Sequence, residues 1–307
     1  MVKILFSTVM IMLVYMCIGF IMCKAKKVKV SHAKSMSAIL LYILGPAMII
    51  NSFIQLEYSG DNLIKIAKYF AVSLTIQLIA FGIIYIILHK KYEDSKYRIL
   101  SVGAVLGNVG YLGMPIIASI FPNESIVLCY SSINVMSMNL IVFTIGTFLI
   151  TNDKQFISVK SAIFNPTTIS ILISLPLFIF NVPFPDIIME SISLLAKMVT
   201  PFCMFVLGMR LAEAEFKKIF TRPFVYVTCL LKLVIFPVLA FVLVTWLPFI
   251  DNITKTSVVV LAMVPSGAII ESLAELHECE QEFAANVVLV TTILSVLTIP
   301  AMYILLG

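Results

Sequence analysis

Apolar segments long enough to cross a lipid bilayer fill most of this 307-residue chain. A membrane-spanning helix needs about 20 mostly apolar residues. Roughly ten such stretches can be marked, each bounded by charged residues, Pro or Asn. They cover residues 4–23, 36–54, 64–88, 99–120, 126–150, 163–180, 187–209, 224–248, 256–275 and 283–306. The sequence therefore predicts an all-α polytopic membrane protein of ten transmembrane helices, with short loops and no separate soluble domain.

The composition agrees with a lipid environment. Only 12% of the residues are charged, whereas soluble domains have about 25%. The first apolar run is long, lacks a small-x-small cleavage site and precedes a basic stretch, which favours a spanning helix over a cleaved signal peptide. The net charge of +5 belongs to loops and does not indicate nucleic-acid binding.

Motifs for catalysis or cofactor binding are absent from the sequence. There is no Gly/Lys phosphate loop, zinc-type His pair or nucleophile elbow. The six cysteines are scattered, without metal-ligand spacing, and are predicted to be free thiols. We therefore expect no enzyme activity, no metal and no cofactor.

Lys and Arg residues gather in alternate loops, which predicts the orientation because cytoplasmic loops carry an excess of these cations. The loops after the first, third, fifth and seventh spans hold 15 of them: Lys24, Lys26, Lys27, Lys29, Lys34, Lys90, Lys91, Lys96, Arg98, Lys154, Lys160, Arg210, Lys217, Lys218 and Arg222. The loops on the opposite side hold Lys3, Lys65 and Lys255. The last predicted cytoplasmic loop is acidic (Glu278, Glu280, Glu282), but acidic residues contribute little to this rule. Both termini are predicted to face out of the cell. Short loops and the absence of an organellar transit peptide indicate a bacterial inner membrane.

Two halves, residues 1–150 and 151–307, share features at an offset of 150–155 residues. The matching pairs are Gly45-Pro46 with Thr200-Pro201, Gln77 with Lys232, Met114-Pro115 with Val264-Pro265, and Asn134 with Asn286. Because each half contains five predicted helices, an odd number, the second half enters the membrane with the opposite topology. Such inverted repeats are common among secondary transporters.

The fourth span is interrupted by glycine and proline, from Gly103 to Pro115, and the ninth span has a matching feature at 265–267. Inside lipid, a broken helix is tolerated only where protein or a wet cavity satisfies the freed backbone groups. Half-helix N-termini at such breaks offer N–H groups and a positive dipole end to an anion. Close packing or a simple kink is the alternative reading. The candidate substrate-binding residues are Asn108, Gly110, Tyr111, Gly113, Pro115, Pro265, Ser266, Gly267, Asn134 and Asn286.

Amides and charges inside the spans need partners. For Asn134 and Asn286, interhelical hydrogen bonding and substrate contact stay equally open, and bonding is favoured for Asn139. Lys197, Lys232 and Glu271 would each cost about 2.5–3.5 kcal/mol at the bilayer centre if unpaired. Lys232 could snorkel or act in coupling, and Glu271 could pair with Lys232, carry a coupling proton or lie at the rim.

The string Gly107-Asn108-Val-Gly110-Tyr111-Leu-Gly113-Met-Pro115 resembles the fourth-span signature of the auxin efflux carrier family. Asn165-Pro166, Pro201-Phe-Cys-Met-Phe-Val-Leu-Gly208 and the tail from Ala262 to Pro300 are also similar. This family includes plant auxin exporters and bacterial malonate or organic-acid permeases. The resemblance implies two inverted five-helix repeats, like those of bile-acid symporters, with a scaffold-like part and a part of crossing broken helices. It also implies that carboxylates bind at the crossing, with Asn108 contributing.

In two places this chain departs from the family pattern, and each departure limits what the resemblance implies. Relatives often have an Asn after the ninth-span proline, where this chain has Ser266, so substrate identity is open. Plant members carry an acid in the third span, and this chain has none between Ile66 and Leu88, so an inherited proton relay is open.

The leading hypothesis is a secondary carrier of small mono- or dicarboxylates that works by alternating access, with the lipid bilayer as its surroundings. The alternatives are a sodium-coupled organic-anion symporter of the bile-acid type and a membrane sensor without transport. Substrate, direction, coupling ion and the pairing of two copies into a homodimer stay open at this stage.

Overall fold

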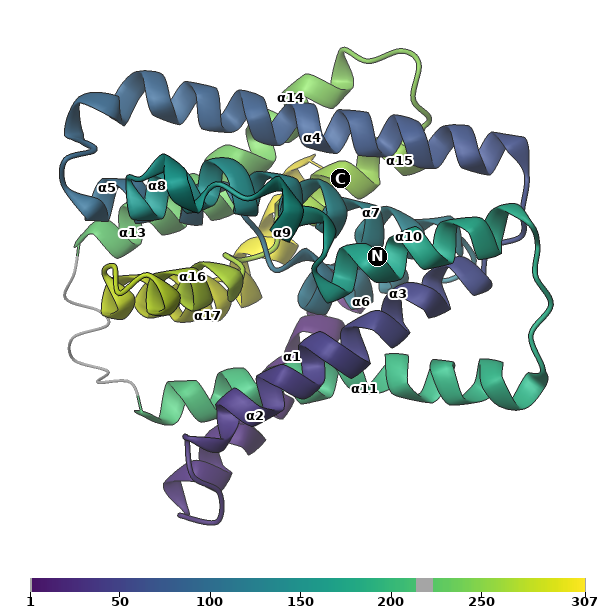
Figure 1. The fold of residues 1–307 in the computed structure, drawn as a ribbon, viewed down its shortest axis with the longest axis horizontal. Helices are drawn as coiled ribbons and strands as arrows, with labels where there is room; N and C mark the ends of the chain where they lie inside the picture. Colours follow the sequence, from purple (N-terminus) through teal and green to yellow (C-terminus); the bar gives the residue numbers. More distant parts are fainter. Residues whose placement is uncertain (1, 214–222, 307) are drawn as a thin grey trace.

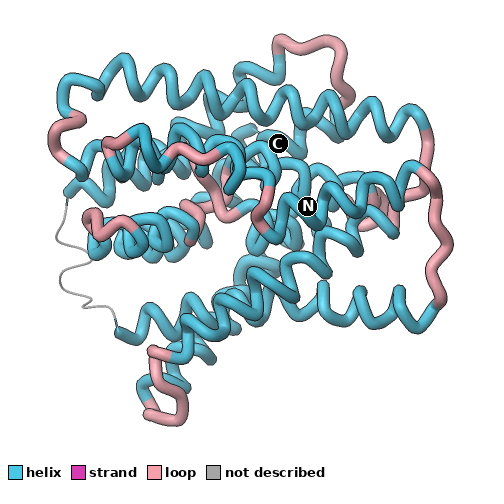
Figure 2. Tube along the Cα trace, in the orientation of Figure 1, coloured by secondary structure: helices cyan, strands magenta, loops and turns pink. Residues whose placement is uncertain are grey.

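The chain forms a bundle of helices with short connections (Figures 1 and 2). The computed structural model describes residues 2–213 and 223–306, and no strand occurs within them. Within these described ranges, eight helical segments are long and apolar enough to cross a membrane. They span Lys3–Lys24, His32–Ile54, Gly60–Lys91, Ile126–Thr151, Lys154–Ile179, Asp186–Ala212, Pro223–Thr245 and Gln281–Leu306. The protein is therefore an all-helical, multi-pass membrane protein.

The helices of the first half are α1 Val2–Lys24, α2 His32–Ile39, α3 Gly45–Ile54, α4 Gly60–Leu88, α5 Ser95–Val105, α6 Met114–Ile120, α7 Ile126–Ile141 and α8 Thr147–Thr151. Those of the second half are α9 Val159–Ile163, α10 Pro166–Ile179, α11 Asp186–Glu213, α13 Pro223–Leu230, α14 Phe236–Thr245, α15 Asn252–Ala262, α16 Ile269–Leu276 and α17 Gln281–Leu306. The two remaining predicted spans, 99–120 and 256–275, are interrupted, as the sequence predicts. The first consists of α5, a π-helical turn and α6, and the second of α15 and α16.

Prolines explain three of the four π-helical turns. The turns Leu40–Leu44, Val109–Gly113 and Leu231–Ile235 each directly precede a helix with proline in its first two positions. Proline lacks the N–H that the regular ladder needs and its ring displaces the preceding carbonyl, so the backbone widens by one residue. The fourth turn, Val142–Gly146, has no proline after it. The widened turns place irregular backbone next to the interrupted helix α5–α6.

The helices pack in two groups. Helix α11 packs against α1, α2 and α3, and α3 packs against α10; we call these five helices the scaffold group. Helices α4 to α8 and α13 to α17 pack mainly among themselves and contain both interrupted spans, and we call them the crossing group. In Figure 1 the scaffold helices α1, α2 and α11 lie in the lower part of the molecule, and α4, α5 and α14 lie in the upper part. This division agrees with the scaffold and crossing parts that the resemblance implies.

Two glycines set the close approach of α1 and α11. A Cβ atom at Gly208 would lie 1.9 Å from the Met16 carbonyl oxygen, and one at Gly19 would lie 2.2 Å from the Phe205 carbonyl oxygen. Both contacts are with backbone, which cannot rotate away. Small residues of this kind let membrane helices pack closely.

Replacing Gly208 with Ala is expected to lower the stability of the protein by about 1–3 kcal/mol, because the added methyl group forces α1 and α11 apart. Thermal unfolding in detergent measures this. Gly82→Ala on α4 is the matched control, because no atom lies within 4 Å of its Cβ position. A melting temperature of Gly208→Ala equal to that of the wild type would contradict the close contact.

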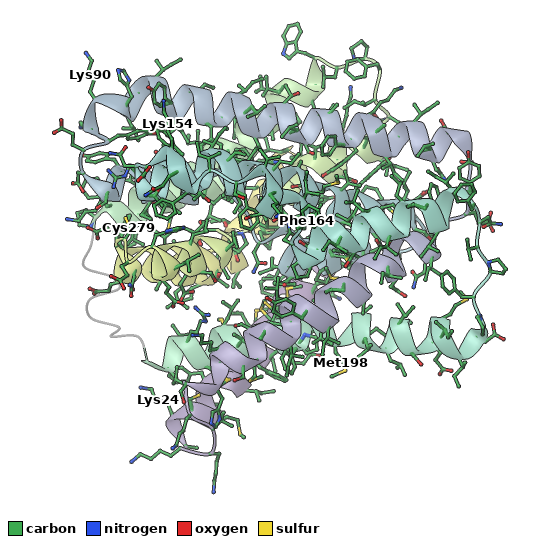
Figure 3. The ribbon with its side chains drawn as sticks, in the orientation of Figure 1. Lys24, Lys90, Lys154, Phe164, Met198 and Cys279 are labelled. Carbon is green, nitrogen blue, oxygen red and sulfur yellow. The ribbon has the colours of Figure 1, made fainter. Side chains whose placement is uncertain are left out.

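Cationic side chains from three different loops lie toward one end of the molecule. Figure 3 shows Lys24, Lys90 and Lys154 on the same side, the left in this view. The sequence assigns all three to cytoplasmic loops. Three other predicted cytoplasmic cations, Lys217, Lys218 and Arg222, lie outside the described residues. Which side of a membrane this end faces stays a prediction.

Candidate functional site

The two interruptions meet and hold each other through backbone hydrogen bonds. Gly107 and Ser266 form an antiparallel bridge. The Asn108 N–H donates to the Pro265 carbonyl oxygen at 2.8 Å, and the Gly267 N–H donates to the Leu106 carbonyl oxygen at 3.0 Å. The non-helical backbone that lipid would leave unsatisfied is thus satisfied by its counterpart. We call this contact the crossing.

Ser266 fixes the crossing from the second half of the chain. Its hydroxyl donates to the Gly103 carbonyl oxygen at 2.8 Å, and its N–H donates to the Thr291 hydroxyl at 3.1 Å. The residue is completely buried. Its polar atoms are used within the protein, so Ser266 joins α5, the crossing and α17.

A cavity of about 250 Å³ lies at the crossing, between the scaffold and crossing groups. Its walls come from α2, α3, α10 and α11 on one side and from the crossing and α7 on the other, and they are mostly apolar. Of the predicted site residues, four line it: Asn108, Gly110, Tyr111 and Gly267. The cavity is of the size and character expected for a small-molecule site with a few polar groups.

Asn108 has a polar group available inside this cavity. The residue is 5% exposed, and its Nδ2 atom donates to no oxygen or nitrogen acceptor. The Cys203 thiol of α11, a weak acceptor, lies beside this amide. An unsatisfied buried donor costs about 1–3 kcal/mol, so a ligand that accepts from it gains that amount. The helical turn that starts at Val109 adds backbone N–H groups that have no partner within the helix.

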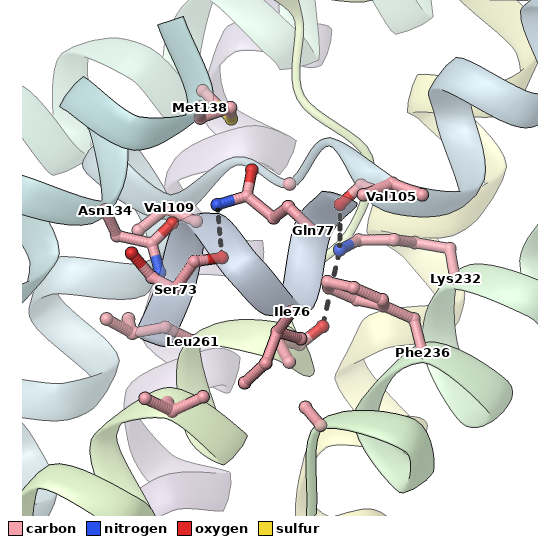
Figure 4. Close-up of a pocket in the computed structure, with 14 residues that line it drawn as sticks. Ser73, Ile76, Gln77, Val105, Val109, Asn134, Met138, Lys232, Phe236 and Leu261 are labelled. Carbon is pink, nitrogen blue, oxygen red and sulfur yellow. Dashed lines mark hydrogen bonds between the residues drawn. The ribbon is translucent and has the colours of Figure 1, made fainter. Parts of the chain in front are cut away.

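Lys232 lies behind the crossing and binds the ends of both broken helices (Figure 4). Its ammonium donates to the carbonyl oxygens of Val105 at 3.1 Å and Ala262 at 3.4 Å, which are the last residues of α5 and α15. It also lies 4.4 Å from the centre of the Phe236 ring. The side chain is 0% exposed, so it does not snorkel to an interface.

A smaller cavity of about 20 Å³ surrounds the Lys232 ammonium. Ser73, Gln77 and Asn134 contribute its polar lining. Gln77, the sequence counterpart of Lys232, thus lines the same space. This volume suits about one water molecule and no organic ligand. Asn134 donates to the Tyr69 hydroxyl at 3.0 Å, an interhelical hydrogen bond within the crossing group.

Glu271 pairs with Arg210 rather than with Lys232. Its carboxylate contacts the Arg210 guanidinium, and Arg210 also lies 3.8 Å from Glu275. Glu271 is 7% exposed, so it is not a solvated rim residue. The pair connects α11 of the scaffold group with α16 of the crossing group.

The remaining residues of the predicted site lie apart from the larger cavity, whereas Asn139 lines it. A Cβ at Gly113 would lie 2.8 Å from Leu261, so this glycine permits close packing of α15. Pro115 and Pro265 shape the two breaks. Asn286 on α17 is buried, with an unpartnered Nδ2 atom. Lys197 is exposed on α11. Asn139 donates to Thr167 at 2.8 Å and to Asn165 at 3.2 Å, which agrees with the bonding role favoured from the sequence.

Comparison with known proteins identifies the family. Residues 4–303 match the family described as membrane transport protein. The chain belongs to this family. The resemblance to auxin efflux carriers is thereby confirmed over nearly the whole length of the chain. A protein of Methanocaldococcus jannaschii described as an uncharacterized transporter is 26% identical over 301 residues, which cover 95% of this chain and 96% of that protein.

As a member of the membrane transport protein family, the chain is a transporter of the multi-pass membrane class. Sequence reasoning did not place Cys203 and Arg210 of α11 at this cavity. Arg210 was counted among loop cations because it ends an apolar run. Its apolar neighbours Met209, Leu211 and Ala212 were the available signal that the helix continues around it.

Proposed function

We propose that this transporter carries small organic anions, mono- or dicarboxylates of the auxin-like or malonate-like kind, by alternating access around the crossing. The supporting observation is the unpartnered Asn108 amide inside a cavity of about 250 Å³. A carboxylate oxygen is a suitable acceptor for this donor. Because the cavity lies between the scaffold and crossing groups, a movement of one group against the other would change its access.

The charge balance of the cavity also favours an anion. Among its described lining residues, Arg210 is the one charged side chain. The N-terminal turns that begin at Val109 and Ile269 open beside the cavity and present the positive ends of their dipoles there. An organic cation would meet these same groups with repulsion.

The proposal includes the membrane arrangement that the sequence indicates. We place residues 1–150 and 151–307 in two inverted five-helix repeats that cross a bacterial inner membrane, with both termini outside. The two interrupted spans, in corresponding positions of the two halves, support this arrangement.

Lys232 bears on the sodium-coupled alternative. In transporters with broken helices, the carbonyls at half-helix C-termini coordinate coupling cations. Here two of these carbonyls already accept hydrogen bonds from the Lys232 ammonium. The protein thus supplies its own cation at this place, which favours sodium-independent transport.

Uptake into proteoliposomes tests the proposed function. Purified protein is reconstituted, and uptake of acetate, malonate, succinate, phenylacetate and indole-3-acetate is measured against protein-free vesicles, in sodium and in choline buffers. We expect saturable uptake of at least one carboxylate at equal rates in both buffers. Uptake that requires sodium would favour the symporter, and uptake of none would contradict carboxylate transport.

A further inference from the structure

Arg210 stands where the cavity, the scaffold group and the crossing group meet. It projects from α11 and lines the cavity together with Asn108. Its side chain is 19% exposed and that of Glu271 is 9% exposed. At such partly buried positions a charge interaction is several times stronger than in bulk water. The ion pair of these two residues is therefore more than a solvated surface contact.

The chemistry of the guanidinium matches the proposed substrate. Arg carries five N–H donors in a planar fork that binds a carboxylate through two parallel hydrogen bonds. Glu271 presents to Arg210 the same carboxylate group that the substrate would present. Glu271 itself does not line the cavity, whereas its neighbour Ser272 does. Arg210 therefore borders the cavity and contacts α16 through its guanidinium.

We propose that Arg210 is the anchor for the substrate carboxylate and that Glu271 occupies this anchor while the carrier is empty. The inference rests on the proposed carboxylate transport. An arriving carboxylate replaces Glu271 on the guanidinium, and a remaining lone pair on one of its two oxygens accepts from the Asn108 amide. Arg210 is thus a binding and specificity residue, and Glu271 is an internal competitor.

The exchange also has a mechanical consequence. The Arg210–Glu271 pair ties α16 of the crossing group to α11 of the scaffold group. After the exchange, the displaced Glu271 faces a second negative charge on the substrate, and Glu275 adds a third nearby. Like charges repel, so substrate binding loosens the tie between the two groups. The loaded carrier is then free to make the movement that the empty carrier resists.

Binding affinities of two variants test the exchange. The probe is whichever of acetate, malonate, succinate, phenylacetate or indole-3-acetate gives the highest uptake with the wild type, and its dissociation constant is measured by calorimetry on the full chain in nanodiscs. Arg210→Gln is expected to weaken binding at least tenfold, since the anchor is lost. Glu271→Gln is expected to strengthen binding several-fold, since the anchor is vacated. If the Arg210–Glu271 pair only held the two helix groups together and Arg210 did not contact substrate, both substitutions would change the dissociation constant in the same direction. That result would overturn the inference.

Control variants separate this inference from the proposed function. Lys197→Gln removes an exposed cation from the same helix, and its affinity should equal that of the wild type. Arg210→Lys keeps the charge but not the fork, so its affinity should lie between those of the wild type and Arg210→Gln. If the wild type transports a carboxylate and Arg210→Gln binds it with an unchanged dissociation constant, the anchor role of Arg210 is rejected and the proposed function is not. Absence of uptake of every carboxylate by the wild type would reject both proposals.

Discussion

Replacing Lys232 with Gln is expected to reduce carboxylate uptake roughly 100-fold, which corresponds to about 2.7 kcal/mol in the rate barrier. The C-terminus of a helix carries roughly −0.5 of an elementary charge. Two such ends, those of α5 and α15, meet at the Lys232 ammonium. Together they amount to about one negative charge, which the ammonium neutralises. Without it, the negative ends of α5 and α15 are uncompensated and offset the positive ends of the turns that begin at Val109 and Ile269, which are the ends that attract an anionic substrate.

Gln keeps hydrogen-bond donors for the two carbonyls, so the variant separates loss of charge from loss of hydrogen bonds. The helical fold should persist, as judged by size-exclusion chromatography and thermal unfolding. Lys232→Ala opens space at the same carbonyls, and we expect sodium to restore part of its uptake, in contrast to the sodium-independent uptake expected of the wild type. Wild-type uptake by a well-folded Lys232→Gln protein would contradict this role.

Gly107→Ala is the second change with a large expected effect. The added Cβ would lie 2.8 Å from the completely buried Val264 and 3.0 Å from the Lys232 ammonium, which can move aside only by giving up its hydrogen bonds to the Val105 and Ala262 carbonyls. Overpacking of this kind costs about 1–3 kcal/mol. Because the strain falls on the bridge between Gly107 and Ser266, we expect at least a tenfold loss of uptake.

The matched control for Gly107→Ala is Gly60→Ala, at the start of α4, where a Cβ meets no atom within 4 Å. This control should transport at the wild-type rate. If Gly107→Ala also transported at the wild-type rate, the tight packing of the crossing around Lys232 would be contradicted.

The interruptions of the fourth and ninth spans were predictable because glycine and proline act through the backbone alone. Gly107 and Pro265 need no knowledge of the fold to indicate a break in a membrane helix. Their matching positions in the two halves also indicated that they belong together. The positions of eight long helices followed from hydrophobic length by the same local reasoning.

The partners of charged side chains were not predictable, because they depend on which helix faces cross. Glu271 pairs with Arg210, 61 positions earlier in the sequence. Lys232 binds backbone carbonyl groups, which every residue has. Backbone carbonyls leave no signature in a sequence. Asn108 lines the larger cavity, whereas the Ser266 hydroxyl is hydrogen-bonded within the protein. This difference between the two residues likewise became clear only from the three-dimensional arrangement.

Carboxylate transport at the crossing depends on binding of the substrate carboxylate by the Asn108 amide. Its most direct test is the dissociation constant of the best-transported carboxylate for the wild type and for Asn108→Ala, measured by calorimetry on protein of equal thermal stability. A hydrogen bond to a charged group contributes about 1.5–3 kcal/mol. We therefore predict binding at least tenfold weaker in Asn108→Ala, and an unchanged dissociation constant would contradict the claim.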